Sequence, residues 1–256
     1  MRARVLVLCY HAVSERWPAD LSIAPRTLRR QLESLLARGW AATTFTHAVT
    51  DPPGGRVLAV TFDDGFRSVG ERAAPLLAEL GIPATVFVPT DWPGRVMRWP
   101  GIDRWLDTPF RDELRALPWA ELRALAAAGW EIGSHSCSHP HLSRLDDDAI
   151  ERELGESRAA CERELRRPCR SLAYPYGDAD DRVRAAAAAA GYEAAAGLSA
   201  AAFDGRSRFE WPRIGVWHGE PDWRFRVKVS PLASQLLGAR SIRALHGPRV
   251  RRARHG

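Results

Sequence analysis

Short apolar runs bounded by turn residues alternate with longer helical patterns along most of the chain. This alternation is typical of strands joined by helical crossovers in a parallel sheet. The apolar runs predict strands at residues 5–10, 57–62, 84–89, 130–134, 171–174, 192–197 and 213–217. The helical patterns predict crossovers at residues 27–38, 71–80, 119–128, 147–166 and 181–190. The sequence therefore predicts an α/β fold, an incomplete (β/α)7 barrel.

Length and composition favour one domain. A chain of 256 residues with 45% hydrophobic residues is long enough for one large core, and α/β barrels of this size are common as single domains. We expect the barrel to occupy residues 1–222 and a basic extension to occupy residues 223–256. Residues 91–118, with three tryptophans and four prolines, interrupt the pattern. We interpret them as an insertion that either grips a substrate or folds over the core.

Polar clusters follow several of the predicted strands. TFDDG at 61–65 ends one strand, HSCSHP at 135–140 follows another, YPYGD at 174–178 ends a third, and His11 ends the first. In a barrel of parallel strands, the loops at the carboxyl ends share one rim. We therefore expect a single site that collects all four clusters.

These residue types point to metal chemistry. Adjacent carboxylates and an H-x-x-x-H pair are ingredients of a divalent metal site, and one Asp with two His leaves positions open for water and substrate. H-x-x-x-H alone is weak evidence, but it becomes strong beside TFDDG on a neighbouring unit. Such a donor set favours Zn²⁺, although its geometry also permits Co²⁺ or Ni²⁺.

Over residues 3–217 the chain resembles the polysaccharide deacetylases, the NodB-homology group or carbohydrate esterase family four. TFDDG and HSCSHP resemble its first two motifs, and YPYGD resembles a variant of the third. The resemblance implies a NodB-like barrel in which Asp63 is the catalytic base. It also implies metal ligation by Asp64, His135 and His139, and stabilisation of the oxyanion by the backbone N–H of Tyr176.

The sequence departs from the commonest family pattern in three places. Ala173 stands where the third motif usually has an arginine that orients the catalytic aspartate. Arg213, in WPRIGVW, is our candidate for that role, with a surface or substrate-facing arginine as the alternative. The fourth motif is not recognisable, and ALHG at 244–247 matches the fifth, which supplies the general acid, only poorly.

His11 is our candidate for the general acid. Taken alone, it reads as a polar residue that caps a buried strand. In the branch of the family with an N-terminal Tyr-His and a YPYG third motif, however, the acid comes from that histidine. We expect the negative charge of Asp63 to keep the His11 imidazolium protonated, and His218 is the alternative acid.

Some residues have a less specific interpretation. Tyr10, Trp211 and Trp217 are candidates for apolar walls beside an acetyl group or sugar ring, with core packing as the alternative. His141 is either close to the metal ligands or a solvated loop residue. The sequence has four cysteines, without a C-x-x-C pair, which we interpret as ordinary thiols.

The combined prediction is a metal-dependent hydrolase that removes an N-acetyl group from an amino sugar in a glycan, lipid-linked sugar or glycoconjugate precursor. The alternatives are a deformylase acting on a lipid-linked formamido sugar and an inactive sugar-binding barrel. The N-terminus has no small-residue cleavage site typical of a secretory signal, so we expect a cytoplasmic location.

The net charge of +6 depends on the C-terminal extension. Residues 223–256 contain nine Lys or Arg and no Asp or Glu. A nucleic-acid-binding arm is one interpretation, but no aromatic-basic interleaving or recognition motif accompanies it. We expect no nucleic-acid partner, and peripheral contact of this extension with an anionic membrane surface. A solvated end is the alternative.

Overall fold

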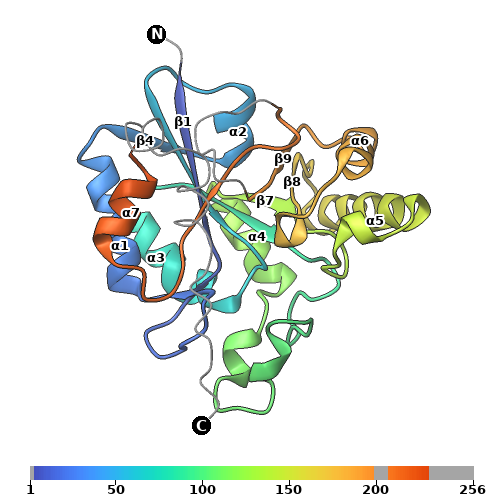
Figure 1. Ribbon diagram of the computed structural model, residues 1–256, viewed down its shortest axis with the longest axis horizontal. Coiled ribbons are helices and arrows are strands. Elements are labelled where there is room, and N and C mark those ends of the chain that lie inside the picture. The colour runs from blue at the N-terminus through green and yellow to red at the C-terminus, as the bar shows by residue number, and fades with distance from the viewer. Residues whose placement is uncertain (1–2, 199–206, 231–256) are drawn as a thin grey trace.

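A computed structural model describes residues 3–198 and 207–230. Its main sheet is curled, and every strand pairing in it is parallel (Figure 1). The strand order is β10-β1-β5-β6-β7-β8-β9, with β4 paired to β5. The predicted incomplete α/β barrel is confirmed. The strands are β1 (Arg4–Tyr10), β4 (Trp40–Thr43), β5 (Arg56–Phe62), β6 (Ala84–Val88), β7 (Glu131–Ser134), β8 (Ser171–Ala173), β9 (Ala194–Ala196) and β10 (Ile214–Gly215).

The two ends of this sheet are linked by residues 211–215. Trp211 pairs with Ala196 of β9, and the Gly197 N–H donates to the Trp211 carbonyl at 2.9 Å. Four residues further on, Gly215 of β10 pairs with Cys9 of β1. This short segment therefore bridges β9 and β1, and Arg213 lies within the bridge.

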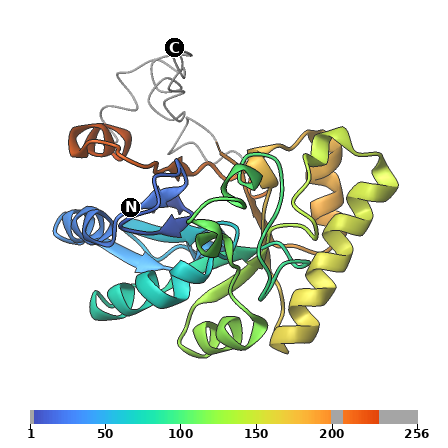
Figure 2. The same ribbon diagram turned by 90° about the horizontal axis from the view of Figure 1, so that it is seen from below.

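Helices cover the outside of the curled sheet (Figures 1 and 2). They are α1 (Pro25–Leu36), α2 (Phe45–Thr50), α3 (Ala74–Glu79), α4 (Trp119–Ala127), α5 (Asp147–Leu165), α6 (Asp181–Ala189) and α7 (Asp222–Lys228). Helix α1 buries Leu28, Leu32 and Leu35 at helical spacing, as its pattern predicts. The N-cap of α5 is Asp146, whose side chain accepts from the Ala149 N–H.

Short elements complete the connections. Strands β2 (Ala12–Val13) and β3 (Ser22–Ile23) form a separate pair. Single turns are η1 (Val69–Ala73), η2 (Asp103–Trp105), η3 (Arg111–Leu114), η4 (Leu142–Arg144) and η5 (Pro175–Gly177). The single helix predicted at 71–80 is instead the π-type turn η1 followed by α3. Pro75 accounts for the difference, because it has no N–H to donate to the carbonyl one α-helical turn earlier.

Alternation along the strands separates two apolar layers. Val5 and Val7 of β1 face the barrel interior, whereas Leu6, Leu8 and Tyr10 belong to the outer layer. The interior is filled mostly by small residues, including Ala59, Ala173, Ala194 and Ala196. The same period of two directs Cys9, Thr61 and Asp63 to the inside, just below the rim.

The described part of the C-terminal extension, residues 223–230, packs on the barrel. Phe225 and Val229 belong to the outer apolar layer. Lys228 is buried, and its Nζ donates to the Gly215 carbonyl at 2.6 Å and to Glu220 at 2.8 Å. Residues 231–256 lie outside the described residues, as do their proposed membrane contact and the ALHG segment. None of the described helices is both long and apolar enough to cross a membrane.

Candidate metal centre and active site

One cavity of about 780 Å³ collects the predicted site residues. Loops after β1, β5, β7 and β8 contribute most of them, and the segment that carries Arg213 leads into β10. This arrangement matches the expectation that the clusters share one rim. All of the predicted catalytic and metal-ligating residues line the cavity: His11, Asp63, Asp64, His135, His139, Tyr176 and Arg213.

Unusual backbone angles position several of these side chains. Asp64, His139 and Tyr176 have φ values of 67°, 69° and 60°, in the left-handed region that non-glycine residues rarely adopt. Each such residue costs about 1–2 kcal/mol, so the surrounding structure must hold it in place. Gly177 follows Tyr176, and a Cβ there would lie 2.7 Å from Leu198 Cβ. This turn therefore requires glycine.

Asp64, His135 and His139 form a compact group of buried ligand atoms. Asp64 Oδ1 lies 3.4 Å from His135 Nε2 and 3.2 Å from His139 Nε2. Two ligands about 2.0–2.1 Å from a zinc ion, at a tetrahedral angle, are about 3.3 Å apart. Asp64 Oδ1 also has no aligned hydrogen-bond donor within the described residues. The group thus fits a divalent ion as it stands.

The two histidine rings are held in place by their surroundings. His135 Nδ1 lies 2.7 Å from the Ala173 carbonyl oxygen, which can only accept, so Nδ1 carries the proton and Nε2 keeps its lone pair. The His139 ring stacks on Trp99, with centroids 4.2 Å apart and planes 16° apart. Both rings therefore present Nε2 to Asp64 without rearrangement.

The charges of this group suit metal ligation. Burial favours the neutral acid of Asp64, but the facing imidazoles of His135 and His139 outweigh it and lower the pKa of Asp64. Burial also lowers the pKa of His139, more than Asp64 raises it. For His135 the balance is reversed, because Asp64 and Asp63 outweigh burial and raise its pKa. Asp64 is therefore ionised, as a ligand must be.

Asp63 is paired with Arg213 in a buried, two-pronged ion pair. Arg213 Nη1 lies 2.6 Å from Asp63 Oδ1, and Nη2 lies 2.7 Å from Oδ2. Arg213 also donates to the Gly197 carbonyl and to Thr61 Oγ1, at 3.2 and 3.1 Å. Burial favours the neutral acid of Asp63, but Arg213 outweighs it and the pKa of Asp63 falls from 3.8 to about 2. Arg213 is therefore not a surface arginine, although it also lines the cavity, so the substrate-facing alternative stays open.

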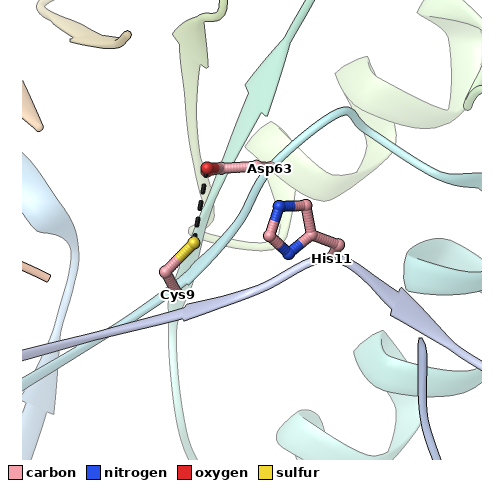
Figure 3. A group of neighbouring side chains, drawn as sticks. All are labelled: Cys9, His11 and Asp63. Carbon is pink, nitrogen blue, oxygen red and sulfur yellow. Dashed lines mark hydrogen bonds between the residues drawn. The ribbon is translucent and has the colours of Figure 1, made fainter. Parts of the chain in front are cut away.

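His11 lies at the end of β1, beside Asp63 and Cys9 (Figure 3). Its ring is 8% exposed and stacks on Trp217, with centroids 5.8 Å apart, and its Nδ1 has no hydrogen-bond partner among the described residues. Burial lowers the pKa of His11 more than the charges of Asp64 and Asp63 raise it. The expectation of a protonated resting imidazole is therefore wrong, because desolvation outweighs the carboxylates.

The other sequence candidates fall in different places. Trp217 lines the cavity, but Tyr10 and Trp211 do not. The Tyr10 hydroxyl donates to Gln31 of α1, and Trp211 packs at the barrel interior. His218 is exposed and does not line the cavity. His141 stacks on Tyr176, with centroids 4.0 Å apart, and so supports the turn that carries Tyr176.

The insertion at 91–118 both packs on the core and walls the site. Trp99, Ile102 and Trp105 line the cavity, while Trp99 and Ile102 also belong to the outer apolar layer. Its backbone is tied to the neighbouring loops, since Asp91 N–H donates to the Cys137 carbonyl and Leu117 N–H to the Gly65 carbonyl. Packing of the insertion on the core is therefore confirmed, while contact of its cavity-lining residues with a substrate stays a prediction.

Sequence reasoning missed several residues of the cavity and its floor. Asp20, Arg104 and Glu210 contribute charges to the lining. Cys9, read as an ordinary thiol, lies under the site and donates from Sγ to Asp63 Oδ2 at 3.3 Å. Asp20, Arg104 and Glu210 lie outside the strand-end motifs, so the sequence does not mark them as site residues. Cys9 could have been found, because alternation along β1 places it on the interior side.

Comparisons with known proteins agree with this geometry. The sequence is 21% identical to YxkH of Bacillus subtilis, which is named as a polysaccharide deacetylase, over 196 residues. The match covers 75% of this chain and 63% of YxkH, so the chain spans less than two thirds of that relative.

Solved structures share the fold. The deacetylase PplD of Streptococcus pyogenes, in complex with acetate, matches with a TM-score of 0.71 at 20% identity, over 89% of this chain and 99% of PplD. IcaB from Ammonifex degensii matches with a TM-score of 0.69 at 24% identity, over 91% of this chain and 97% of IcaB. The family model described as polysaccharide deacetylase matches residues 50–195, which include Asp63, Asp64, His135 and His139. The resemblance seen in the motifs is thus confirmed, and the chain belongs to the polysaccharide deacetylase family.

Proposed function

We propose that this protein is a metal-dependent hydrolase that removes an N-acetyl group from an amino sugar. The observation that carries the proposal is that one cavity holds two sets of side chains, one suited to binding a metal ion and one suited to proton transfer. Asp64, His135 and His139 have the spacing of zinc ligands. Beside them lie Asp63, which is ion-paired, and His11, whose Nδ1 has no hydrogen-bond partner among the described residues. A sugar-binding barrel without catalysis would need neither set.

Asp64, His135 and His139 would hold the ion, and zinc suits their mixed oxygen and nitrogen donors best. A bound divalent ion supplies Lewis acidity, which polarises an acyl carbonyl and acidifies water. Co²⁺ and Ni²⁺ are compatible with the same ligands. These three residues therefore act as ligands, and the proton transfers fall to their neighbours.

Asp63 is the base in this proposal. Arg213 holds the carboxylate in one orientation and, by lowering its pKa, keeps it ionised at neutral pH. Each carboxylate oxygen has a second lone pair, so Asp63 can accept a proton from the attacking water while it stays paired with Arg213. Arg213 thus acts through Asp63 as a positioning residue.

His11 is the acid, but it must obtain its proton during turnover. The ring is neutral at rest, and one of its nitrogens lies within 4.8 Å of an Asp63 oxygen. Through one bridging water, the proton that Asp63 takes from the attacking water would pass to His11 and then to the departing amine, which cannot leave unprotonated. One proton leaves the water and one arrives on the amine, so the sequence is balanced.

The lining supports an amino-sugar substrate. A volume of about 780 Å³ lies within the range of about 300–1,000 Å³ that is usual for small-molecule sites. Trp105 and Trp217 offer flat apolar surfaces to an acetyl group or a sugar face. We propose the backbone N–H of Tyr176 as the oxyanion donor, whose loss typically costs about 3 kcal/mol in the barrier.

We further propose that the substrate is a glycan, lipid-linked or glycoconjugate precursor, met in the cytoplasm. The basic residues of 231–256 would place the enzyme at an anionic membrane surface, where each Lys or Arg contributes about 1 kcal/mol. This part of the proposal rests on sequence alone.

The test is release of acetate and formate from a panel of N-acyl amino sugars by the zinc-loaded protein. Acetate release that disappears on chelation, returns with Zn²⁺ and is absent from Asp63→Asn supports the proposal. Formate release in place of acetate would identify a deformylase. If the metal-loaded protein binds the sugars but releases neither acid, the barrel is a binding protein and the proposal is wrong.

A further inference from the structure

Cys9, His11 and Asp63 bring a second set of potential ligand atoms together beside the first. Cys9 is fully buried at the end of the interior row of β1, and its Sγ lies 3.3 Å from Asp63 Oδ2. The sulfur, a ring nitrogen of His11 and a carboxylate oxygen of Asp63 all lie within 4.8 Å of one another (Figure 3). Sulfur, nitrogen and oxygen therefore converge on one point next to the Asp64 group.

The spacing of this cluster suits a tetrahedral ion. A zinc–sulfur bond of about 2.3 Å and a zinc–oxygen bond of about 2.0 Å, at a tetrahedral angle, separate sulfur and oxygen by about 3.5 Å. The observed separation of Cys9 Sγ and Asp63 Oδ2 is 3.3 Å. His11 Nδ1 has no hydrogen-bond partner among the described residues, so ligation by His11 breaks no existing bond at that nitrogen.

Arg213 limits the affinity of the cluster without abolishing it. Arg213 uses one lone pair on each Asp63 oxygen, and a carboxylate has about four such positions in all. With Cys9 as thiolate and Asp63 ionised, the two negative charges exceed the single charge of Arg213 by one. Among the described residues, Asp64 forms no ion pair with an arginine or lysine, so we expect the Asp64 group to fill first.

We propose that Cys9, His11 and Asp63 form a second, thiophilic metal site that takes up Zn²⁺, Cd²⁺ or Co²⁺ supplied in excess. Binding replaces the Cys9 thiol proton, which leaves to solvent, by a metal–sulfur bond. The thiolate excludes Mg²⁺ and Ca²⁺, which prefer oxygen ligands. This further step rests on the proposed function: metal binding at this second site inhibits the enzyme, because the ion binds both the base, Asp63, and the acid, His11.

The test follows Co²⁺ added to the metal-free protein, because a cobalt–thiolate bond gives a charge-transfer band in the near ultraviolet. In the wild type we expect the first equivalent to bind without that band and the second to produce it. Cys9→Ser keeps a hydroxyl donor to Asp63, takes up the first equivalent and loses the band. Cys137→Ser, at the only described cysteine that is not fully buried, is the matched control and keeps the band.

A second variant tests the same site in case Cys9→Ser misfolds. His11→Gln retains the cysteine, and we expect its affinity for the second equivalent to fall by more than about tenfold, as is usual when a ligand or its close support is lost. A second equivalent that binds without the band, or equally well to Cys9→Ser, would overturn the site. If the band forms but excess Zn²⁺ leaves acetate release unchanged, the site stands and the roles assigned to Asp63 and His11 are wrong.

Discussion

Replacing Arg213 tests how Asp63, the proposed base, is kept ionised. Arg213→Met removes the guanidinium but retains a long apolar side chain at a position that is 1% exposed. Arg213 is the largest influence that lowers the pKa of Asp63, from 3.8 to about 2, against burial that raises it. Without Arg213 the burial effect is opposed only by the weaker influences of His135 and His11, so the pKa of Asp63 rises from about 2. We expect the acidic limb of the rate profile to move up by about two pH units.

The same substitution affects folding stability. A carboxyl group whose pKa is about two units lower in the folded state contributes about 2–3 kcal/mol to the free energy of unfolding. That contribution is present above about pH 4, the unfolded pKa, and is lost as the pH falls towards 2. Arg213→Met loses it and also leaves a buried carboxylate unpaired, which typically costs about 3–5 kcal/mol.

The assay is kcat/KM for acetate release across the acidic pH range, with metal content and urea unfolding measured on the same samples. Arg213→Lys restores one positive charge without the two-pronged geometry, so its limb should lie between those of the wild type and Arg213→Met. Arg158→Met removes an arginine that bonds backbone carbonyls away from the cavity and should leave the limb in place. An unchanged limb in a folded, metal-loaded Arg213→Met would refute the reasoning.

Four further outcomes follow. His135→Ala should lose the tightly bound metal that survives dialysis, together with activity; stoichiometric metal in that variant would mean the ligands are misassigned. Asp63→Asn should keep that metal while kcat falls by about 10² or more, and an equal loss of metal would mean that Asp63 is also a ligand. His11→Gln should lose far more rate on N-acyl sugars than on an aryl acetate, whose leaving group needs no proton; equal losses would make His11 structural. Deletion of residues 231–256 should reduce co-sedimentation with anionic liposomes, and an unchanged amount would exclude the membrane contact.

The sequence predicted those parts of the site that follow strongly patterned strands. Asp63 and Asp64 directly follow β5, and His135 and His139 lie in the loop that follows β7. One barrel rim was therefore enough to bring these residues together. Arg213 lies outside residues 50–195, which the family model matches, and was found only because Ala173 lacks the expected arginine. The contact with Asp63 is present, while its catalytic role stays a prediction.

Other features depend on the folded structure. Strand β4 and helix α2 are absent from the predicted elements, because both are short and have no clear apolar pattern. The Phe, Thr and Val residues of α2 are also weak helix formers. The resting charge of His11 was predicted wrongly because the size of a desolvation effect depends on burial that no local pattern records. The stacking of Trp99 on His139 joins two loops far apart in the sequence, and spacing alone does not reveal it.

The bridge at residues 211–215 makes assembly of the site dependent on the last part of the barrel to be synthesised. Until Trp211 pairs with β9 and Gly215 with β1, both strands keep an open edge, and Asp63 is enclosed without its counter-ion. Closing the barrel and pairing Asp63 with Arg213 are thus one event. On the proposed mechanism, a local opening of this bridge would inactivate the enzyme while most of the barrel stayed folded, so we expect heat inactivation to precede unfolding of the core.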